Sequence, residues 1–176
     1  MSKKIVLAIL LIVMGSCGCV CVALADNSAK TQECSREFTI KNLVDLTNKE
    51  RDQAGLSLLT ENGSLDKAAQ MKLDDMIKLR YFGHDNKFGT KYWMWVSIAG
   101  YRFDKTGENL AVGYYDARRM VAAWMSSPSH RANILYSQYK DIGFAVGILT
   151  LEDGSRGIAV VQEFGRSSSS SNLAKK

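Results

Sequence analysis

Residues 124–135 read Trp-Met-Ser-Ser-Pro-Ser-His-Arg-Ala-Asn-Ile-Leu, and they carry the clearest helix signals in the chain. A helix that Asp116 can cap is expected to end near Met125. Pro128 then suits the first turn of a second, shorter helix, because its missing N–H is not needed there. The pattern predicts two consecutive helices, the second running through Leu135.

Two apolar segments follow these helices, over residues 142–150 and 157–164. They flank Glu-Asp-Gly-Ser at 152–155, which has the composition of a hairpin turn. Apolar residues occupy most positions of both segments, so helices are expected to cover both faces of the sheet that they form.

More helices are expected on the N-terminal side. Thr39 can cap a helix that runs to about Ala54 and stops at Gly55. Ser64 can cap a second helix that runs to about Arg80, with apolar residues at the 3.6-residue spacing of one buried face.

The middle of the chain alternates loops with a short helix. A loop is predicted over residues 81–90, where it carries His84, and another over 107–113. An aromatic helix is predicted between them, over 91–99. Because helices come first and a hairpin comes last, the order predicts an α+β layered domain.

The N-terminus has the pattern of an export signal. Two lysines precede an uncharged run over residues 5–25, which ends in the small-x-small sequence Ala-Leu-Ala. We therefore expect a signal peptide over residues 1–25, cleaved before Asp26.

Two alternatives for this leader stay open. The uncharged run is just long enough to cross a bilayer core of ~30 Å as an uncleaved anchor. Met-Gly-Ser-Cys at 14–17 resembles a lipobox, in which Cys17 would be acylated. All three interpretations place the chain from Asp26 onward outside the cytoplasm, secreted or at the cell surface, with a membrane contacted only through the leader.

The rest of the chain divides into a linker over 26–37, one domain over 38–166 and a disordered serine-rich tail over 167–176. The formal net charge is +5, and lysines and an arginine near the two ends account for all of it. Residues 26–165 are net neutral, so the domain lacks the basic surface that nucleic acids require.

Cysteine usage agrees with this division. Cys17, Cys19 and Cys21 lie in the leader, so that only Cys34 remains if the leader is removed. No disulfide within the mature chain is then expected.

Three motifs carry chemistry beyond these elements. They are Tyr-Phe-Gly-His at 81–84, Gly-Glu-Asn-Leu-Ala at 107–111 and the stretch at 124–135, which leads into Asp-Ile-Gly-Phe-Ala-Val at 141–146. In this order and spacing they resemble the bacterial branch of the CAP superfamily, also known as the SCP/PR-1 fold. The resemblance covers residues 38–166. It implies a three-layer α-β-α sandwich with a small central sheet.

The resemblance also implies a cleft in which two histidines and two acids can bind a divalent metal, often zinc. His84 matches the first histidine, Glu108 the glutamate of Gly-Glu-Asn, and His130 the second histidine. The fourth member, an acid after the helix of Trp124, is missing. We therefore expect weak binding of zinc or another divalent cation and no other cofactor.

The residues themselves leave a structural interpretation open. Glu108 could tie loop amides together, and His130 could brace the turn at Pro128. Glu163 could pair with Glu108 for acid–base chemistry, although strand alternation can also point Glu163 to solvent. No nucleophile stands out, so no catalytic residue is assigned.

The resemblance favours an exported, non-enzymatic binding module of the cell envelope or the extracellular space. Its partner would be a lipid, an envelope component or another protein. Two alternatives are a metal-assisted hydrolase of envelope peptides or esters and a structural surface domain without a small ligand.

Overall fold

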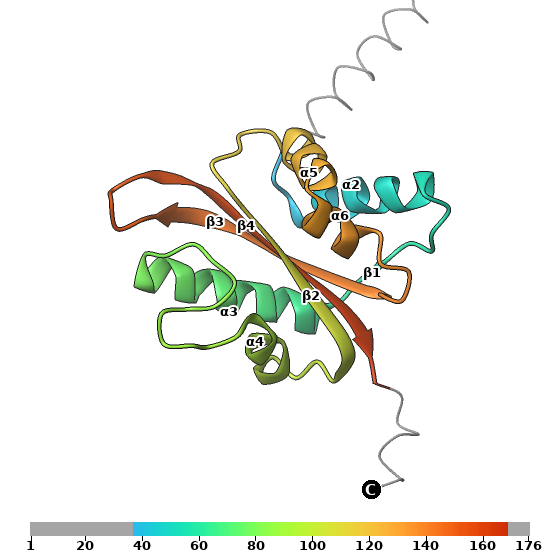
Figure 1. The fold of residues 1–176 in the computed structure, drawn as a ribbon, viewed down its shortest axis with the longest axis horizontal. Coiled ribbons are helices and arrows are strands. Elements are labelled where there is room, and N and C mark those ends of the chain that lie inside the picture. Colours follow the sequence, from blue (N-terminus) through green and yellow to red (C-terminus); the bar gives the residue numbers. More distant parts are fainter. Residues whose placement is uncertain (1–36, 169–176) are drawn as a thin grey trace, which may run out of the picture. The chain divides into compact units, whose positions relative to one another are not determined.

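The computed structural model describes residues 37–168, which form five helices and four strands (Figure 1). The predicted signal peptide and its two alternatives lie outside the described residues. The elements in chain order are α2 (Ile40–Gln53), β1 (Thr60–Glu61), α3 (Gly63–Leu79), α4 (Tyr92–Ile98), β2 (Phe103–Val112), α5 (Ala117–Ser126), α6 (Pro128–Ile134), β3 (Asp141–Thr150) and β4 (Arg156–Ser167).

The strands form one mixed sheet in the order β1-β3-β4-β2. The short β1 runs parallel to β3, whereas β4 is antiparallel to both β3 and β2. The predicted terminal hairpin is confirmed, with Thr150 opposite Arg156 at its turn. Among the described strands β2 pairs with β4 alone, so its other side is an edge of the sheet.

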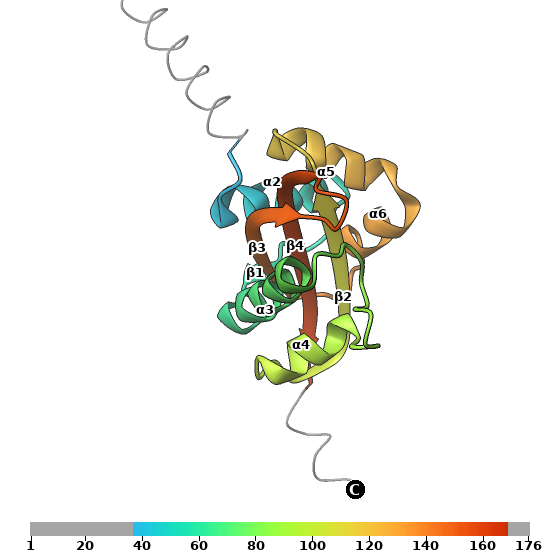
Figure 2. The ribbon, with the colours of Figure 1, turned by 90° about the vertical axis from the view of Figure 1, so that its left-hand side faces the viewer.

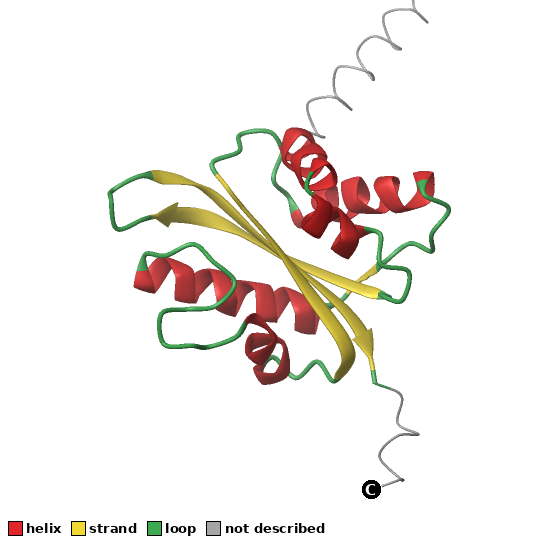
Figure 3. Cartoon of the chain, viewed as in Figure 1, coloured by secondary structure: helices red, strands yellow, loops and turns green. Residues whose placement is uncertain are grey.

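Helices cover both faces of this sheet (Figures 2 and 3). On one face α3 packs along β3 and β4, and α4 packs against α3 and β2. On the other face lie α2, α5 and α6 (Figure 1). The three-layer α-β-α sandwich with a small central sheet is confirmed.

The approach of α3 to the sheet is very close at Gly143 of β3. A side chain there would clash with the backbone of Leu65 and Asp66, in the first turn of α3. Asp66 Oδ1 accepts the backbone N–H of Phe144 at 2.9 Å, which fixes the same contact.

Apolar side chains fill both spaces between sheet and helices. The core residues on the α3 and α4 face are Leu65, Ala68, Ala69, Leu73, Met76, Val96, Ala99, Tyr101, Leu110, Ala145, Leu149, Ala159 and Val161. Those on the opposite face are Leu43, Leu59, Ala111, Ala117, Met120, Val121, Trp124, Ile134, Tyr139, Ile142, Phe144, Val160 and Phe164.

Two predicted helix caps are confirmed and one is wrong. Thr39 Oγ1 accepts the N–H of Asn42 at 3.2 Å, and Asp116 caps α5. The cap of α3 is Asn62 rather than Ser64: Asn62 Oδ1 accepts the N–H of Ser64 at 3.0 Å. Asn62 has the extended backbone that a cap requires, and Ser64 is already helical.

The loop predicted over 107–113 is wrong, because residues up to Val112 belong to β2. Its glycine and polar residues are typical of a turn, but here the polar side chains are buried and bonded across the sheet. Gly107 is small for a packing reason, since a side chain there would clash with Tyr139.

Strand β4 extends beyond the predicted end of the domain. It continues to Ser167, and the N–H of Ser168 donates to the carbonyl of Arg102 at 3.1 Å. The rest of the predicted tail lies outside the described residues. Between residues 37 and 168, no helix combines the length and apolar character needed to cross a membrane.

Candidate functional site

The register of β2 against β4 places two polar pairs next to each other on opposite faces of the sheet. Glu108 lies opposite Glu163, and Asn109 lies opposite Gln162. Side chains alternate along a strand, so the acid pair points toward α3 and the amide pair points toward α2 and α6. All four side chains are buried.

His84 reaches the acid pair from the loop that follows α3. Its Nδ1 donates to Glu108 Oε1 at 2.6 Å. The His84 side chain is 52% exposed and that of Glu108 is fully buried, so the bond joins the surface to the interior. The hydrogen bond to Glu108 raises the pKa of His84 more than its own partial burial lowers it.

Glu163 is fully buried, so the idea that its strand points it to solvent is wrong. Burial, and then the charge of Glu108, raise the pKa of Glu163 well above its ordinary value. Burial also raises the pKa of Glu108, although His84 and Lys72 oppose this. We therefore assign one proton to the pair and place it on Glu163, because Glu108 accepts a hydrogen bond from His84.

Lys72 of α3 supplies a buried positive charge beneath the site. Its Nζ donates to the carbonyls of Gly83 and His84 at 2.7 and 2.8 Å and to the Tyr81 hydroxyl at 2.8 Å. Burial lowers the pKa of Lys72, and the nearby charge of Glu108 opposes that shift. The ammonium group therefore both holds the loop of His84 and balances the acid pair.

Asp75, one turn along α3 from Lys72, fixes the rest of this loop. Its Oδ2 accepts from the Tyr81 hydroxyl at 2.6 Å and from Asn86 Nδ2 at 3.1 Å. Asn86 Oδ1 in turn accepts the backbone N–H groups of Phe88 and Thr90. The loop is therefore tied to α3 on both sides of His84.

The amide pair belongs to a chain of hydrogen bonds on the opposite face. Asn109 Nδ2 donates to Gln162 Oε1 at 2.9 Å and to the carbonyl of His130 at 3.2 Å. Asn109 Oδ1 accepts from Asn133 Nδ2 at 2.9 Å, and Gln162 Nε2 donates to Thr47 Oγ1 at 3.0 Å. These bonds join α6, β2, β4 and α2.

His130 occupies the first turn of α6, and its ring packs against Trp124 with centroids 6.4 Å apart. Burial, and then the charge of His84, lower the pKa of His130. The two histidines therefore differ: His84 is biased toward the charged imidazolium and His130 toward the neutral ring.

The three predicted site residues are only partly brought together. His84 and Glu108 are hydrogen-bonded, whereas His130 belongs to α6 in the other helix layer (Figure 1), and its ring has no hydrogen bond to either of them. Within residues 37–168, no three or more His, Cys, Asp or Glu side chains are grouped closely enough to hold a metal ion. The residues therefore do not fit a zinc site with three or four protein ligands.

A hollow of about 290 Å³ lies along the outer edge of β2, and we call it the edge groove. Loop and α5–α6 side chains form its walls, and three residues of β2 form its floor. None of its lining residues is charged at neutral pH. They are Phe82, Leu110, Ala111, Val112, Tyr114, Ala123, Trp124, Ser127 and His130.

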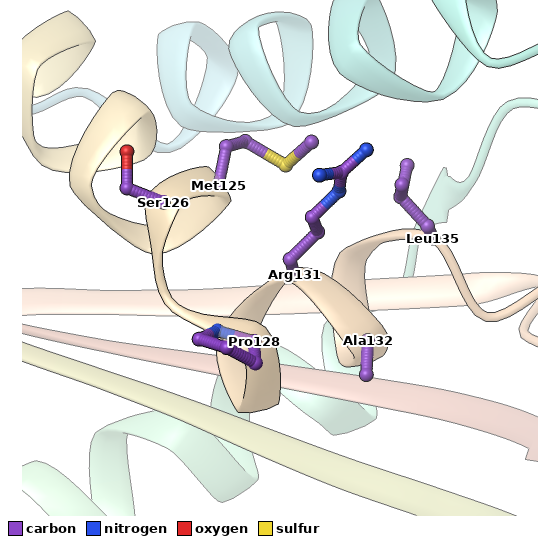
Figure 4. Close-up of a pocket in the computed structure, with 6 residues that line it drawn as sticks. All are labelled: Met125, Ser126, Pro128, Arg131, Ala132 and Leu135. Atoms are coloured by element: carbon purple, nitrogen blue, oxygen red, sulfur yellow. The ribbon is translucent and has the colours of Figure 1, made fainter.

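A second hollow, of about 410 Å³, shares no lining residue with the edge groove. It lies along α5 and α6, and Figure 4 shows Met125, Arg131 and Leu135 on its α2 side. None of the predicted site residues contributes to it.

Two parts of the site were not predicted. Lys72 falls four residues after Ala68 and four before Met76, both on the buried face of α3, and this spacing signals a buried cation. The amide pair of Asn109 and Gln162 had no comparable signal, because only the register of two distant strands brings it together.

Comparisons with known proteins agree with this architecture. The model of the cysteine-rich secretory protein family, CAP, matches residues 44–164. The chain is 38% identical over 104 residues to the uncharacterized protein YkwD of Bacillus subtilis strain 168. That match covers 58% of this chain and 40% of YkwD, so the chain spans about two fifths of this relative.

Two solved structures share the fold. An outer surface protein from Borrelia burgdorferi has a TM-score of 0.62 and 26% identity, over 73% of this chain and 92% of that one. An extracellular SCP-domain protein from Bacillus anthracis has a TM-score of 0.63 and 25% identity, over 78% of this chain and 43% of that one.

The family match covers more than half of the chain and includes the motifs at 81–84, 107–111 and 124–135. These motifs supply His84, the β2 polar residues and α6, which meet around the edge of one sheet. The chain belongs to the CAP family, the cysteine-rich secretory proteins.

Proposed function

We propose that this chain is an exported, non-enzymatic binding module that acts outside the cytoplasm and holds its ligand in the edge groove. The observation that carries the proposal is the groove itself. It is a mostly apolar hollow of about 290 Å³ beside His130, and no charged side chain lines it. Apolar walls with a few polar groups are typical of binding sites.

The groups that could do chemistry here are held in structural roles, which favours binding over catalysis. His84 uses Nδ1 to hold Glu108, and Glu163 is buried without access to solvent. The hydroxyls of Ser127 and Ser129, the two candidate nucleophiles next to His130 in the sequence, lie 3.3 Å from each other. A hydrolase would need one of these groups to be released and aimed at a substrate.

Export is supported by the leader pattern in the sequence and by the descriptions of the related structures. The Borrelia burgdorferi relative is an outer surface protein and the Bacillus anthracis relative is extracellular. Fractionation of a host that expresses the full chain tests this part. We expect the protein in the medium or at the cell surface, and its retention in the cytoplasm would contradict export.

Divalent metal binding enters the proposal only as a weak property of the two imidazoles. His84 Nε2 and the His130 ring are available as donors, and water would have to supply the other ligands. Calorimetric titration with zinc chloride should therefore show weak binding that is lost in both His84→Ala and His130→Ala. Tight binding, or binding unchanged in both variants, would contradict this assignment.

A pair of alanines on α5 provides the test of the groove. Ala123 lines the groove, whereas its neighbour Ala122 is exposed elsewhere on the same helix. Ala123→Phe should fill the hollow, and Ala122→Phe is the matched control. The measurement is co-sedimentation of the protein with isolated cell-envelope fragments.

We expect wild type and Ala122→Phe to sediment with the fragments and Ala123→Phe to stay in solution. Equal sedimentation of all three proteins would contradict the proposed function, because the ligand would then not be held in the edge groove. Turnover of a panel of ester and peptide substrates, lost in His84→Ala, would favour the hydrolase alternative. If wild type does not sediment at all, a purely structural surface domain is favoured.

A further inference from the structure

The outer edge of β2 is covered by side chains of the same chain along only part of its length. Three backbone carbonyls, two residues apart, each accept a hydrogen bond from a side chain of a neighbouring helix. The pairs are Thr106 with Tyr92 Oη at 3.3 Å, Glu108 with Asn133 Nδ2 at 3.0 Å, and Leu110 with Trp124 Nε1 at 3.0 Å.

These bonds show which residues of β2 turn their backbone groups away from β4. The N–H and C=O of one residue in an antiparallel strand point to the same side, and the side alternates along the chain. Gly113 donates its N–H to Ile158 of β4. Leu110 and Val112 therefore direct their N–H groups outward, as the carbonyl of Leu110 confirms.

The row of covering side chains ends at the carbonyl of Leu110, which is also the first β2 residue in the floor of the edge groove. Within the described part of the chain, neither the N–H of Leu110 nor the N–H and C=O of Val112 has a hydrogen-bond partner among the observed contacts. Both residues form the floor of the groove. Folded proteins normally protect an edge strand, because its free backbone groups pair readily with another chain.

We propose that an extended, uncharged segment of another polypeptide binds in the edge groove as a fifth strand, paired with Leu110 and Val112 of β2. The inference rests on the proposed function, since it names the class of ligand that the same groove takes. Addition of a strand to an open sheet edge is a general mode of peptide recognition.

The shape and chemistry of the groove favour a peptide over other envelope ligands. Two outward N–H groups separated by two residues lie ~6.8 Å apart, which is the repeat of carbonyls along an extended peptide. The lining offers no cation for a phosphate or carboxylate. Its volume lies at the small end of the usual ~300–1,000 Å³, which suits alternate side chains of one strand.

The free groups also fix which atoms of the peptide are needed. In an antiparallel arrangement, the peptide residue opposite Val112 both accepts and donates a hydrogen bond. The residue opposite Leu110 only accepts, because Trp124 already occupies the carbonyl of Leu110. One peptide N–H is therefore required, and the N–H two residues away is not.

The experiment uses full-length protein recovered from an exporting bacterial host and a library of uncharged hexapeptides. The strongest binder is resynthesised with one backbone N-methyl group at each position in turn. We expect one methylation to weaken binding about tenfold or more, and methylation two residues away to change it less than about twofold. Uniform tolerance of all methylations would overturn the inference.

Amide hydrogen exchange gives a second readout within the protein. The amides of Leu110 and Val112 should become protected when the peptide is added. The amide of Ala111 is the internal control, because it faces β4 and should be protected with or without the peptide. Protection that does not change at Leu110 and Val112 would contradict strand addition.

Val112→Pro removes one outward N–H without removing a bond to β4, and proline is tolerated at such edge positions. It should abolish peptide binding, whereas the matched variant Val112→Ala should retain it. If Ala123→Phe abolishes envelope sedimentation but no peptide binds, strand addition fails while the proposed function stands. If Ala123→Phe has no effect on sedimentation, the proposed function itself fails.

Discussion

The pairs Glu108–Glu163 and Asn109–Gln162 are neighbours on the same two strands and are buried on opposite faces of one sheet. In the amide pair, both side-chain nitrogens and both oxygens have partners. In the acid pair, Glu108 Oε2 and both oxygens of Glu163 have no hydrogen-bond partner among the described residues.

The difference separates a structural network from a titratable one. Neutral amides can donate and accept at once, so the network through Asn109 closes on itself without charge. Two buried carboxyls that face each other cannot both ionise at low cost, so one keeps its proton, and a cation must balance the charge of the other. Lys72 provides that balance, so the acid face should respond to pH and to charge removal, whereas the amide face should not.

Lys72→Met should have the largest effect on the stability of the acid face. It leaves the buried acid pair without its balancing cation and frees the loop of His84. We expect a loss of about 3–5 kcal/mol in the free energy of unfolding at neutral pH, measured by urea denaturation. Lys67→Met, at an exposed position of the same helix, is the control and should change stability by less than about 0.5 kcal/mol.

Asn109→Ala tests the amide face. It leaves Gln162 Oε1 and the carbonyl of His130 without their donor, so we expect a loss of about 2–3 kcal/mol. The loss should be the same at pH 5 and pH 8, because the broken bonds involve no group that titrates in this range. A loss that varied with pH would mean that the two faces are coupled through the sheet.

Glu163→Gln tests the difference between the two faces through the pH dependence of stability. The pKa of Glu163 is raised in the folded chain, so the folded state holds a proton that the unfolded state releases above about 4.5. Wild type therefore loses stability as the pH rises from that value, by at most about 1.4 kcal/mol per pH unit. The variant lacks this titration, and its unfolding midpoint in urea should exceed that of wild type at pH 8 more than at pH 5.

If the difference between Glu163→Gln and wild type is the same at both pH values, Glu163 is not the proton holder. Glu108→Gln then becomes the informative variant, since burial raises the pKa of Glu108 as well. It would also remove the acceptor of His84 Nδ1.

Much of the fold could be predicted from local sequence signals. A few neighbouring residues are enough to predict the helix caps at Thr39 and Asp116. The same holds for the helix that begins at Pro128 and for the terminal hairpin. Strand β2 could not be predicted in this way. Gly107 serves packing against Tyr139, and its polar neighbours are satisfied by residues more than 20 positions away.

The candidate site likewise contains residues that local motifs predict and residues that only the fold brings in. His84 and Glu108 were predicted from motifs, and a direct hydrogen bond joins them. The burial of Glu163 depends on which face of β4 meets α3, and that is set by the pairing register rather than by the strand itself. The edge groove requires the strand order, because only an edge strand can form its floor.

The smallest expected effect concerns the two imidazoles, of which only His84 is hydrogen-bonded to the acid pair. A proton NMR titration should give His84 a pKa above the ordinary 6.5 and His130 a pKa below it. The contribution of His84 to stability is then fully present below pH 6.5 and is lost as the pH rises through its folded pKa. Because His84 is half exposed, His84→Gln should cost less than about 1 kcal/mol.

Glu108→Gln should lower the pKa of His84, because the bond to Glu108 is the main cause of its rise. The His130 pKa, which depends first on burial, should change much less. Equal shifts of both histidines would contradict this, because Glu108 would then act on His130 as strongly as on its own hydrogen-bond partner. A shift of His84 alone would show that the bond from Nδ1 to Glu108, and not a general change in the field of the site, raises the pKa of His84.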